Sequence, residues 1–192
     1  GTGSIIANKQ QQILYEAPIS FTAIKKIINE YSPDIPLTIH TKDNIYSLNQ
    51  KRQYSLPITP ISSIDLLKEE ELYGMSFHFK DNKSAKAFAD WLGKSDHQEV
   101  KAFVNIQDVD MAGRNCSKGN AINILCQKLG LMHEQVYAIG DAENDIDMLK
   151  AAKHGYTFYR SPNTVKQHAE DCVESVAELI YNYLNNRVGG GD

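Results

Sequence analysis

The feature that most constrains the fold of this chain is an apolar segment that runs directly into a cluster of acidic and amide side chains. Residues 135–139 are rich in apolar side chains, Gly140 and Asp141 follow, and Asn144 and Asp145 open a helical pattern. In parallel α/β sheets, ligands bind just beyond the carboxyl ends of the strands. The segment therefore predicts a strand–loop–helix unit with its polar side chains at such an end.

These side chains have the chemistry of a cation site. Carboxylates gathered at one strand end repel each other unless a cation joins them. A few hard oxygen ligands suit Mg²⁺, which keeps water molecules and binds substrate phosphate as well. We therefore expect Asp141 and Asp145 to hold Mg²⁺, and Asn144 to contact the substrate. The alternative is a structural loop in which an acidic residue caps the next helix, but the complete pattern favours the cation site.

The C-terminal part of the chain alternates between helical and strand patterns, which is typical of a parallel sheet. The expected elements are helix 118–129, strand 135–139, a helix before residue 153, strand 156–159, and helices 164–169 and 175–184.

Residues 20–107 have a different pattern, rich in strands, which predicts an α+β module. Ser20 is a good N-cap for a helix, and Asp81 caps another. The expected strands lie at 37–40, 45–48, 73–79 and 99–106, with a fifth at 108–112, a loop over 49–61 and a short helix over 62–70. Residues 3–7 and 13–15 form two short strands before the module.

Composition excludes several classes of protein. The net charge of −4 gives no basic footprint for nucleic acid. No apolar run is long enough to cross a bilayer, and no signal peptide opens the sequence. Three cysteines without paired spacing indicate reduced thiols, and the six histidines have no metal-ligand spacing. We therefore expect a cytoplasmic protein that contacts neither membrane nor nucleic acid.

Two segments carry a resemblance to a known family. The string GDAENDIDML, from Gly140 onward, resembles the fourth motif of the haloacid dehalogenase (HAD) superfamily in its Cof-type sugar-phosphate phosphatases. Residues 115–121, Asn-Cys-Ser-Lys-Gly-Asn-Ala, resemble the "sKG.Al" segment of the same family. This resemblance implies that Lys118 is catalytic and binds the substrate phosphate, a role that suits a lysine as a point charge.

The resemblance also implies a domain organisation. The fold would be α/β, with a Rossmann-like parallel sheet as its core, incomplete at the N-terminus, and an inserted α+β cap of the C2 type. Residues 1–19 and 108–192 would form the core, and residues 20–107 the cap.

The sequence departs from the family pattern in two places. No DxDGT segment, which carries the nucleophile in this family, occurs; Asp108-Val109-Asp110 has the spacing but reads as a strand. Residues 155–161 also differ from the usual Gly-Val-Ala-Met-Gly-Asn-Ala stretch. Without the first strand of the family sheet, the strand at 135–139 would have a bare parallel edge. We expect a missing N-terminal segment or a second chain to complete the sheet.

The expected function is Mg²⁺-dependent hydrolysis of a small phosphorylated metabolite, in particular a sugar phosphate. The reaction would pass through an aspartyl-phosphate whose aspartate lies outside these 192 residues, so this chain alone would be inactive. One alternative is a non-catalytic fragment or pseudoenzyme that binds a phosphorylated ligand. Another is the phosphorylation domain of a cation-pumping ATPase, although no membrane segment accompanies it.

Overall fold

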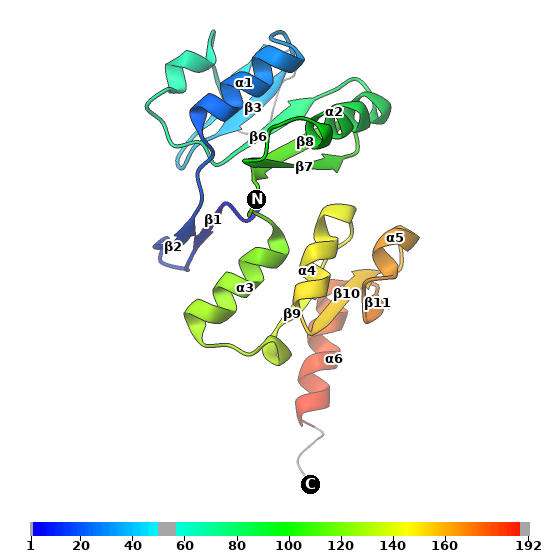
Figure 1. Cartoon of the computed structure of the whole chain (residues 1–192). Coiled ribbons are helices and arrows are strands. Elements are labelled where there is room, and N and C mark those ends of the chain that lie inside the picture. Colours follow the sequence, from blue (N-terminus) through cyan, green and yellow to red (C-terminus); the bar gives the residue numbers. More distant parts are fainter. Residues whose placement is uncertain (1, 50–56, 189–192) are drawn as a thin grey trace. The chain divides into compact units, whose positions relative to one another are not determined.

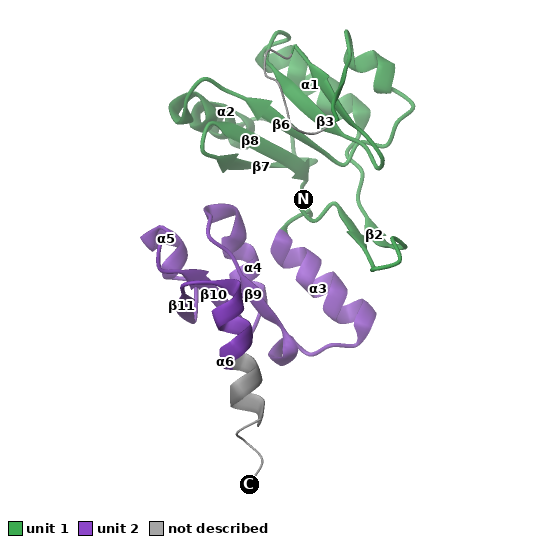
Figure 2. Ribbon diagram, turned by 180° about the vertical axis from the view of Figure 1, so that it is seen from behind, with its two compact units in different colours: residues 1–117 green, residues 118–192 purple. Residues whose placement is uncertain are grey.

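The computed structural model describes residues 2–49 and 57–188. The chain divides into two compact units, unit 1 (residues 1–117) and unit 2 (residues 118–192), shown in Figure 2. No helix in the described ranges is both long and apolar enough to cross a membrane.

Unit 1 is built on a six-stranded sheet. Its strands are, in spatial order, β5 (Thr59–Pro60), β4 (Ile45–Leu48), β3 (Leu37–His40), β6 (Gly74–His78), β8 (Asp108–Gly113) and β7 (Val100–Asn105). All neighbouring strands are antiparallel except β4 and β5. A separate antiparallel hairpin joins β1 (Ile5–Ala7) to β2 (Ile13–Glu16).

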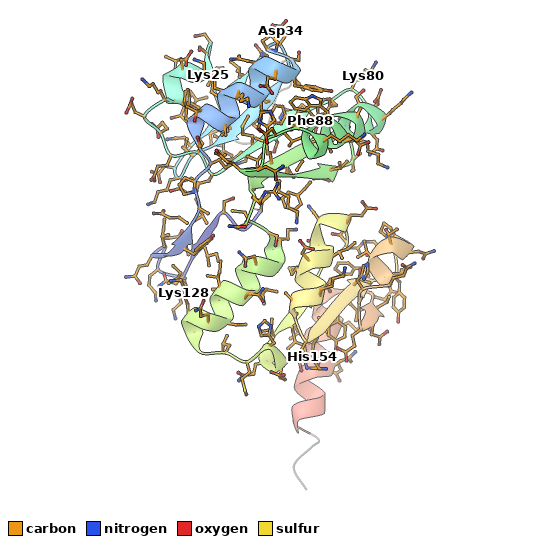
Figure 3. All side chains as sticks on the ribbon, viewed as in Figure 1. Lys25, Asp34, Lys80, Phe88, Lys128 and His154 are labelled. Atoms are coloured by element: carbon orange, nitrogen blue, oxygen red, sulfur yellow. The ribbon has the colours of Figure 1, made fainter. Side chains whose placement is uncertain are left out.

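Two helices pack on one face of the six-stranded sheet, α1 (Phe21–Tyr31) and α2 (Asn82–Lys94) (Figure 1). Period-two alternation puts Leu37, Phe77 and Val109 opposite one another on this face, and all three are fully buried. Phe88 of α2 is also fully buried against them (Figure 3). A side chain of this size contributes about 1.5–3 kcal/mol when it is buried.

The opposite face of this sheet carries polar side chains. His78 Nδ1 lies 3.1 Å from an Asp108 carboxylate oxygen, and the Ser76 hydroxyl donates to Asp110. The Asp108-Val109-Asp110 segment is therefore part of a strand, as predicted, and both of its carboxylates have hydrogen-bond partners within the sheet.

Unit 2 contains a three-stranded parallel sheet in the order β11 (Asp171–Val173), β10 (His154–Phe158) and β9 (Tyr137–Ile139). Among the described residues, β10 is the only strand paired with β9, so the other edge of β9 is open. The helical elements are α3 (Lys118–Leu129), η2 (His133–Gln135), η3 (Glu143–Asp145), α4 (Ile146–Ala151), α5 (Asn163–Lys166) and α6 (Val176–Val188).

The α/β fold class, with its parallel sheet, is confirmed, but several boundaries are corrected. The strand expected from residue 135 begins at Tyr137, because a 3₁₀ turn occupies residues 133–135. The helix expected over 62–70 is only the 3₁₀ helix η1 (Ile64–Leu67). In the loop expected over 49–61, Thr59 and Pro60 pair with β4, while residues 50–56 lie outside the described ranges.

The boundary between the two predicted domains also needs correction at β8. This strand pairs with β6 on one side and β7 on the other, so the α+β module extends through Gly113 and does not end at residue 107. The pairing follows from the apolar alternation of Val109 and Met111, which buries both side chains on the helix-covered face. That the module is a cap inserted into a core domain stays a prediction.

Candidate active site

The loop after β9 is held by β10, its neighbour in the sheet. The Gly140 N–H donates to the Tyr156 carbonyl over 3.1 Å, which continues the parallel pairing beyond the end of the strand. The fully buried Thr157 hydroxyl donates to the Gly140 carbonyl over 2.7 Å. Ser161 Oγ lies 2.9 Å from the same hydroxyl and accepts from the Phe158 N–H. These hydrogen bonds fix the backbone of Gly140, the residue that precedes Asp141.

Asp145 is the buried carboxylate of the site, with only 4% of its surface exposed. Its Oδ2 accepts hydrogen bonds from the backbone N–H groups of Asp141, over 3.0 Å, and Ala142, over 3.1 Å. The carboxylate can fold back over the loop because residue 140 is glycine: a Cβ there would lie 2.4 Å from the Asp145 Cβ. Gly140 is therefore required by a close approach.

Lys118 supplies a positively charged side chain to the site. It is the first residue of α3, and its Nζ donates to Asp145 Oδ1. The next residue, Gly119, lets α3 approach α4, since a Cβ at this position would lie 2.3 Å from the Asp147 carbonyl oxygen. Lys118 thus provides the positive charge, and Gly119 allows the close approach of α3 to α4 that brings this charge to the Asp145 carboxylate.

The electrostatic balance at Asp145 favours its ionised form. Burial on its own raises the pKa of this carboxyl, but the hydrogen bond from Lys118 and those from the Ala142 and Asp141 amides outweigh burial. The net result is a pKa below the ordinary value of 3.8. The Asp145 carboxyl is consequently ionised at neutral pH.

Asp141 and Asn144 complete the predicted cluster. Asp141 is exposed, whereas Asn144 Oδ1 is buried and has no hydrogen-bond partner within the described parts of the chain. Burying an amide oxygen that accepts no hydrogen bond costs free energy. Such an oxygen is well suited to bind a cation, or to accept a hydrogen bond from a ligand. The oxygen-rich donor set of Asp141, Asn144 and Asp145 therefore fits Mg²⁺ chemically.

The same cluster is not a complete metal cage. Across residues 2–49 and 57–188, no three His, Cys, Asp or Glu side chains are arranged to hold a metal ion. Both Asp145 oxygens already accept hydrogen bonds, although each has further lone-pair capacity. Water or substrate oxygens would have to complete the coordination, as is usual for Mg²⁺. The assignments of Asp141, Asn144, Asp145 and Lys118 to metal and substrate stay predictions.

The arrangement places a fixed positive charge and several oxygen ligands just beyond the carboxyl end of a parallel strand, where α/β proteins bind ligands. A family model described as haloacid dehalogenase-like hydrolase matches residues 2–179. The chain belongs to the haloacid dehalogenase-like hydrolases. The family predicted from residues 115–121 and 140–149 is thereby confirmed.

Two solved structures have a similar fold. SMU.1108c from Streptococcus mutans UA159 aligns with a TM-score of 0.84 at 23% identity, over 96% of this chain and 75% of that one. The HAD subclass IIB sugar phosphatase BT4131 aligns with a TM-score of 0.77 at 15% identity, over 95% of this chain and 73% of that one. Both likenesses concern the fold.

Among curated relatives, the pyridoxal phosphate phosphatase YbhA of Escherichia coli is 35% identical over 81 residues, which are 40% of this chain and 30% of YbhA. The chain spans less than a third of the length of this and several other curated relatives that it matches.

Sequence reasoning missed two positioning residues of this haloacid dehalogenase-like site, Thr157 and Ser161. In the sequence, the segment that contains them stands out only as a departure from the family pattern. A signal was present, because Thr157 and Ser161 are hydroxyl residues four positions apart at the end of an apolar strand. Such residues often bind local backbone groups.

Proposed function

We propose that this chain carries the phosphate- and magnesium-binding part of a phosphomonoester hydrolase. The observation that supports it best is the Lys118–Asp145 ion pair beside the exposed Asp141 and the unsatisfied Asn144 oxygen. Lys118 keeps part of its side chain exposed, so its ammonium can contact a phosphate while Asp145 holds it in place. Catalysis of phosphoryl transfer depends mainly on such positioning and charge stabilisation.

Asp141 and Asp145 would hold Mg²⁺, with the Asn144 oxygen beside them. When bound, the ion offsets charge on the transferring phosphoryl group. Lys118 orients the phosphate, and the amides of Asp141 and Ala142 keep the Asp145 carboxylate in place. In the proposed reaction an aspartate attacks phosphorus, the bond to the ester oxygen breaks, and water hydrolyses the aspartyl-phosphate.

The nucleophilic aspartate would come from outside the 192 residues. Asp108 and Asp110, which have the DxD spacing, lie in β8 and bind His78 and Ser76. The open edge of β9 could pair with a further parallel strand, either from a longer chain or from a second chain, and such a strand would end next to Asp141. Pairing there would also remove an exposed edge.

For the substrate we propose a small phosphorylated metabolite, a sugar phosphate in particular. The printed names of BT4131, a sugar phosphatase, and YbhA, a pyridoxal phosphate phosphatase, support this size class. The second candidate function is binding of a phosphorylated ligand without turnover. The absence of a DxDGT segment from the sequence favours it.

Calorimetric titrations test the binding part of the proposal on the chain as it stands. Inorganic phosphate should bind in the presence of Mg²⁺, and Lys118→Met should weaken its binding by about tenfold or more, since a charge-assisted hydrogen bond is lost. Asp141→Asn should weaken Mg²⁺ binding by a similar factor. Lys128→Met, an exposed lysine of the same helix, serves as the control. Equal phosphate affinities for all variants would contradict the site.

A further inference from the structure

Unit 1 contains a pocket that takes no part in the proposed phosphate site. Its volume is about 450 Å³, within the range of small-molecule sites. It lies where α2 ends and β7 begins, and the residues that line it are Ala89, Leu92, Gly93, Ser95, His97, Gln98, Val100, Lys101, Ala102 and Arg114.

Gly93 lines this pocket without a side chain. It lies within α2, where glycine costs about 1 kcal/mol relative to alanine. A Cβ at this position would meet no atom within 4 Å, and the backbone is not in the left-handed region. Neither packing nor backbone conformation therefore requires glycine here. The missing side chain leaves free space at the pocket.

Arg114 gives the pocket a fixed positive charge. Its Nε donates to the Gln98 carbonyl and its Nη2 to Gln98 Oε1, so the guanidinium plane is held in one orientation. A guanidinium has five N–H donors, and these two bonds leave others for a ligand. Lys101 also lines the pocket, whereas its lining includes no Asp or Glu.

The rest of the lining has no such excess of charge. His97 Nε2 lies 2.8 Å from a Glu30 carboxylate oxygen, so this imidazole already has a partner. Leu92 and Val100 are buried apolar residues that provide a hydrophobic wall. The pocket thus combines an apolar wall with an oriented guanidinium, which is the combination that binds an anion attached to a small apolar body.

We propose that this pocket is a second ligand site that binds a small organic anion. Arg114 receives its carboxylate or phosphate group, and the apolar part of the ligand lies against Leu92 and Val100. The site shares no residue with Lys118, Asp141, Asn144 or Asp145, and it does not depend on the proposed hydrolase activity.

Amide NMR spectra of the 192-residue chain, titrated with benzoate, phenyl phosphate and neutral benzyl alcohol, test this proposal. Both anions should cause saturable shifts in residues 89–102 at millimolar concentration, and benzyl alcohol should bind about tenfold more weakly or worse. The anion that binds with the higher affinity identifies the preferred ligand group as carboxylate or phosphate. Shifts in residues 118–145 report the phosphate site and are counted separately.

Two variants make the test specific. Arg114→Gln should weaken binding by about tenfold or more, with Lys86→Gln, an exposed cation on α2, as its control. Gly93→Leu should fill the pocket and abolish the shifts while keeping the circular dichroism of the fold. Ala87→Leu adds the same bulk at an exposed position of α2 and should leave binding intact.

Several outcomes would overturn the proposal. These are no saturable shift in residues 89–102 up to about 20 mM of either anion, equal binding of benzyl alcohol, or unchanged affinity in Arg114→Gln. If Arg114→Gln fails to fold, Gly93→Leu becomes the test. An anion affinity equal to that of the wild type in Gly93→Leu would then overturn the proposal.

Discussion

Lys118, the first residue of α3, forms an ion pair with Asp145, 27 positions later at the end of η3. The lysine side chain is partly exposed, and the Asp145 side chain is almost completely buried. The pair therefore joins two elements of unit 2 and leaves part of the lysine side chain accessible, as the proposed phosphate contact requires. Stability and phosphate binding should respond to it separately.

Removing Lys118 should destabilise the chain. Lys118→Met leaves the buried Asp145 carboxylate without its cation, and we expect the free energy of unfolding to fall by about 2 kcal/mol. Urea denaturation measures this loss. Lys128→Met, at the exposed end of the same helix, should change stability by less than about 0.5 kcal/mol (Figure 3). Adding Asp145→Asn to Lys118→Met should recover part of the loss, and strict additivity would argue against the pair.

Asp145 should also make stability depend on acid pH. Its pKa in the folded chain lies below the ordinary 3.8, so the unfolded chain binds the proton more readily. The stabilisation is complete above the unfolded pKa and is lost as the pH falls from about 4 through the lower folded pKa. The free energy of unfolding, measured by denaturation across this pH window, should fall more steeply with decreasing pH for the wild type than for Asp145→Asn. Parallel pH profiles would show that Asp145 is not the group involved.

Two glycines should respond in opposite directions to the same substitution. Gly140→Ala places a Cβ 2.4 Å from the Asp145 Cβ and 2.7 Å from its Cγ, which should cost about 1–3 kcal/mol. Gly93→Ala meets no atom within 4 Å in a helix, and it should stabilise by about 0.5–1 kcal/mol. Thermal unfolding of both variants compares them directly. A neutral Gly140→Ala would contradict the close approach described for the loop.

The hydroxyl of Thr157 should matter more than its methyl group. Thr157→Val keeps the shape but removes the donor to the Gly140 carbonyl, so a loss of about 1–3 kcal/mol is expected. Thr164→Val, at an exposed position of α5, is the matched control and should change stability little. If both variants unfold at the same denaturant concentration as the wild type, Thr157 does not hold the loop.

The local patterns of the sequence predicted much of this fold. Helix 118–129 was predicted with its exact bounds because an apolar face and a flanking Gly130 define both its extent and its end. The strands β3 and β4 were predicted because each is a short, largely apolar run and a polar turn separates them. The strand β11 was missed, since Asp171 opens it and its three residues form no apolar run of the kind that marks β1 and β9.

The candidate site was predicted as a set of residues but not as a geometry. The motif around Gly140 indicated that Asp141, Asn144 and Asp145 lie at a strand end, and the structure places them there. The ion pair of Asp145 with Lys118 could not be derived from spacing, because it depends on how α3 packs against α4. Pairing of β8 with both β6 and β7 is likewise a long-range contact, which explains the boundary error at residue 107.

Lys118 and the Asp141–Asp145 loop are proposed to form the phosphate site of a magnesium-dependent phosphatase whose nucleophile lies outside these residues. Steady-state hydrolysis of p-nitrophenyl phosphate tests this proposal most directly. The 192-residue chain should show no turnover. A chain extended by an upstream DxDGT segment should turn over with Mg²⁺, and Lys118→Ala or Asp141→Ala should each slow it by about 100-fold or more. Turnover by the 192 residues alone, or an inactive extended chain, would contradict the account.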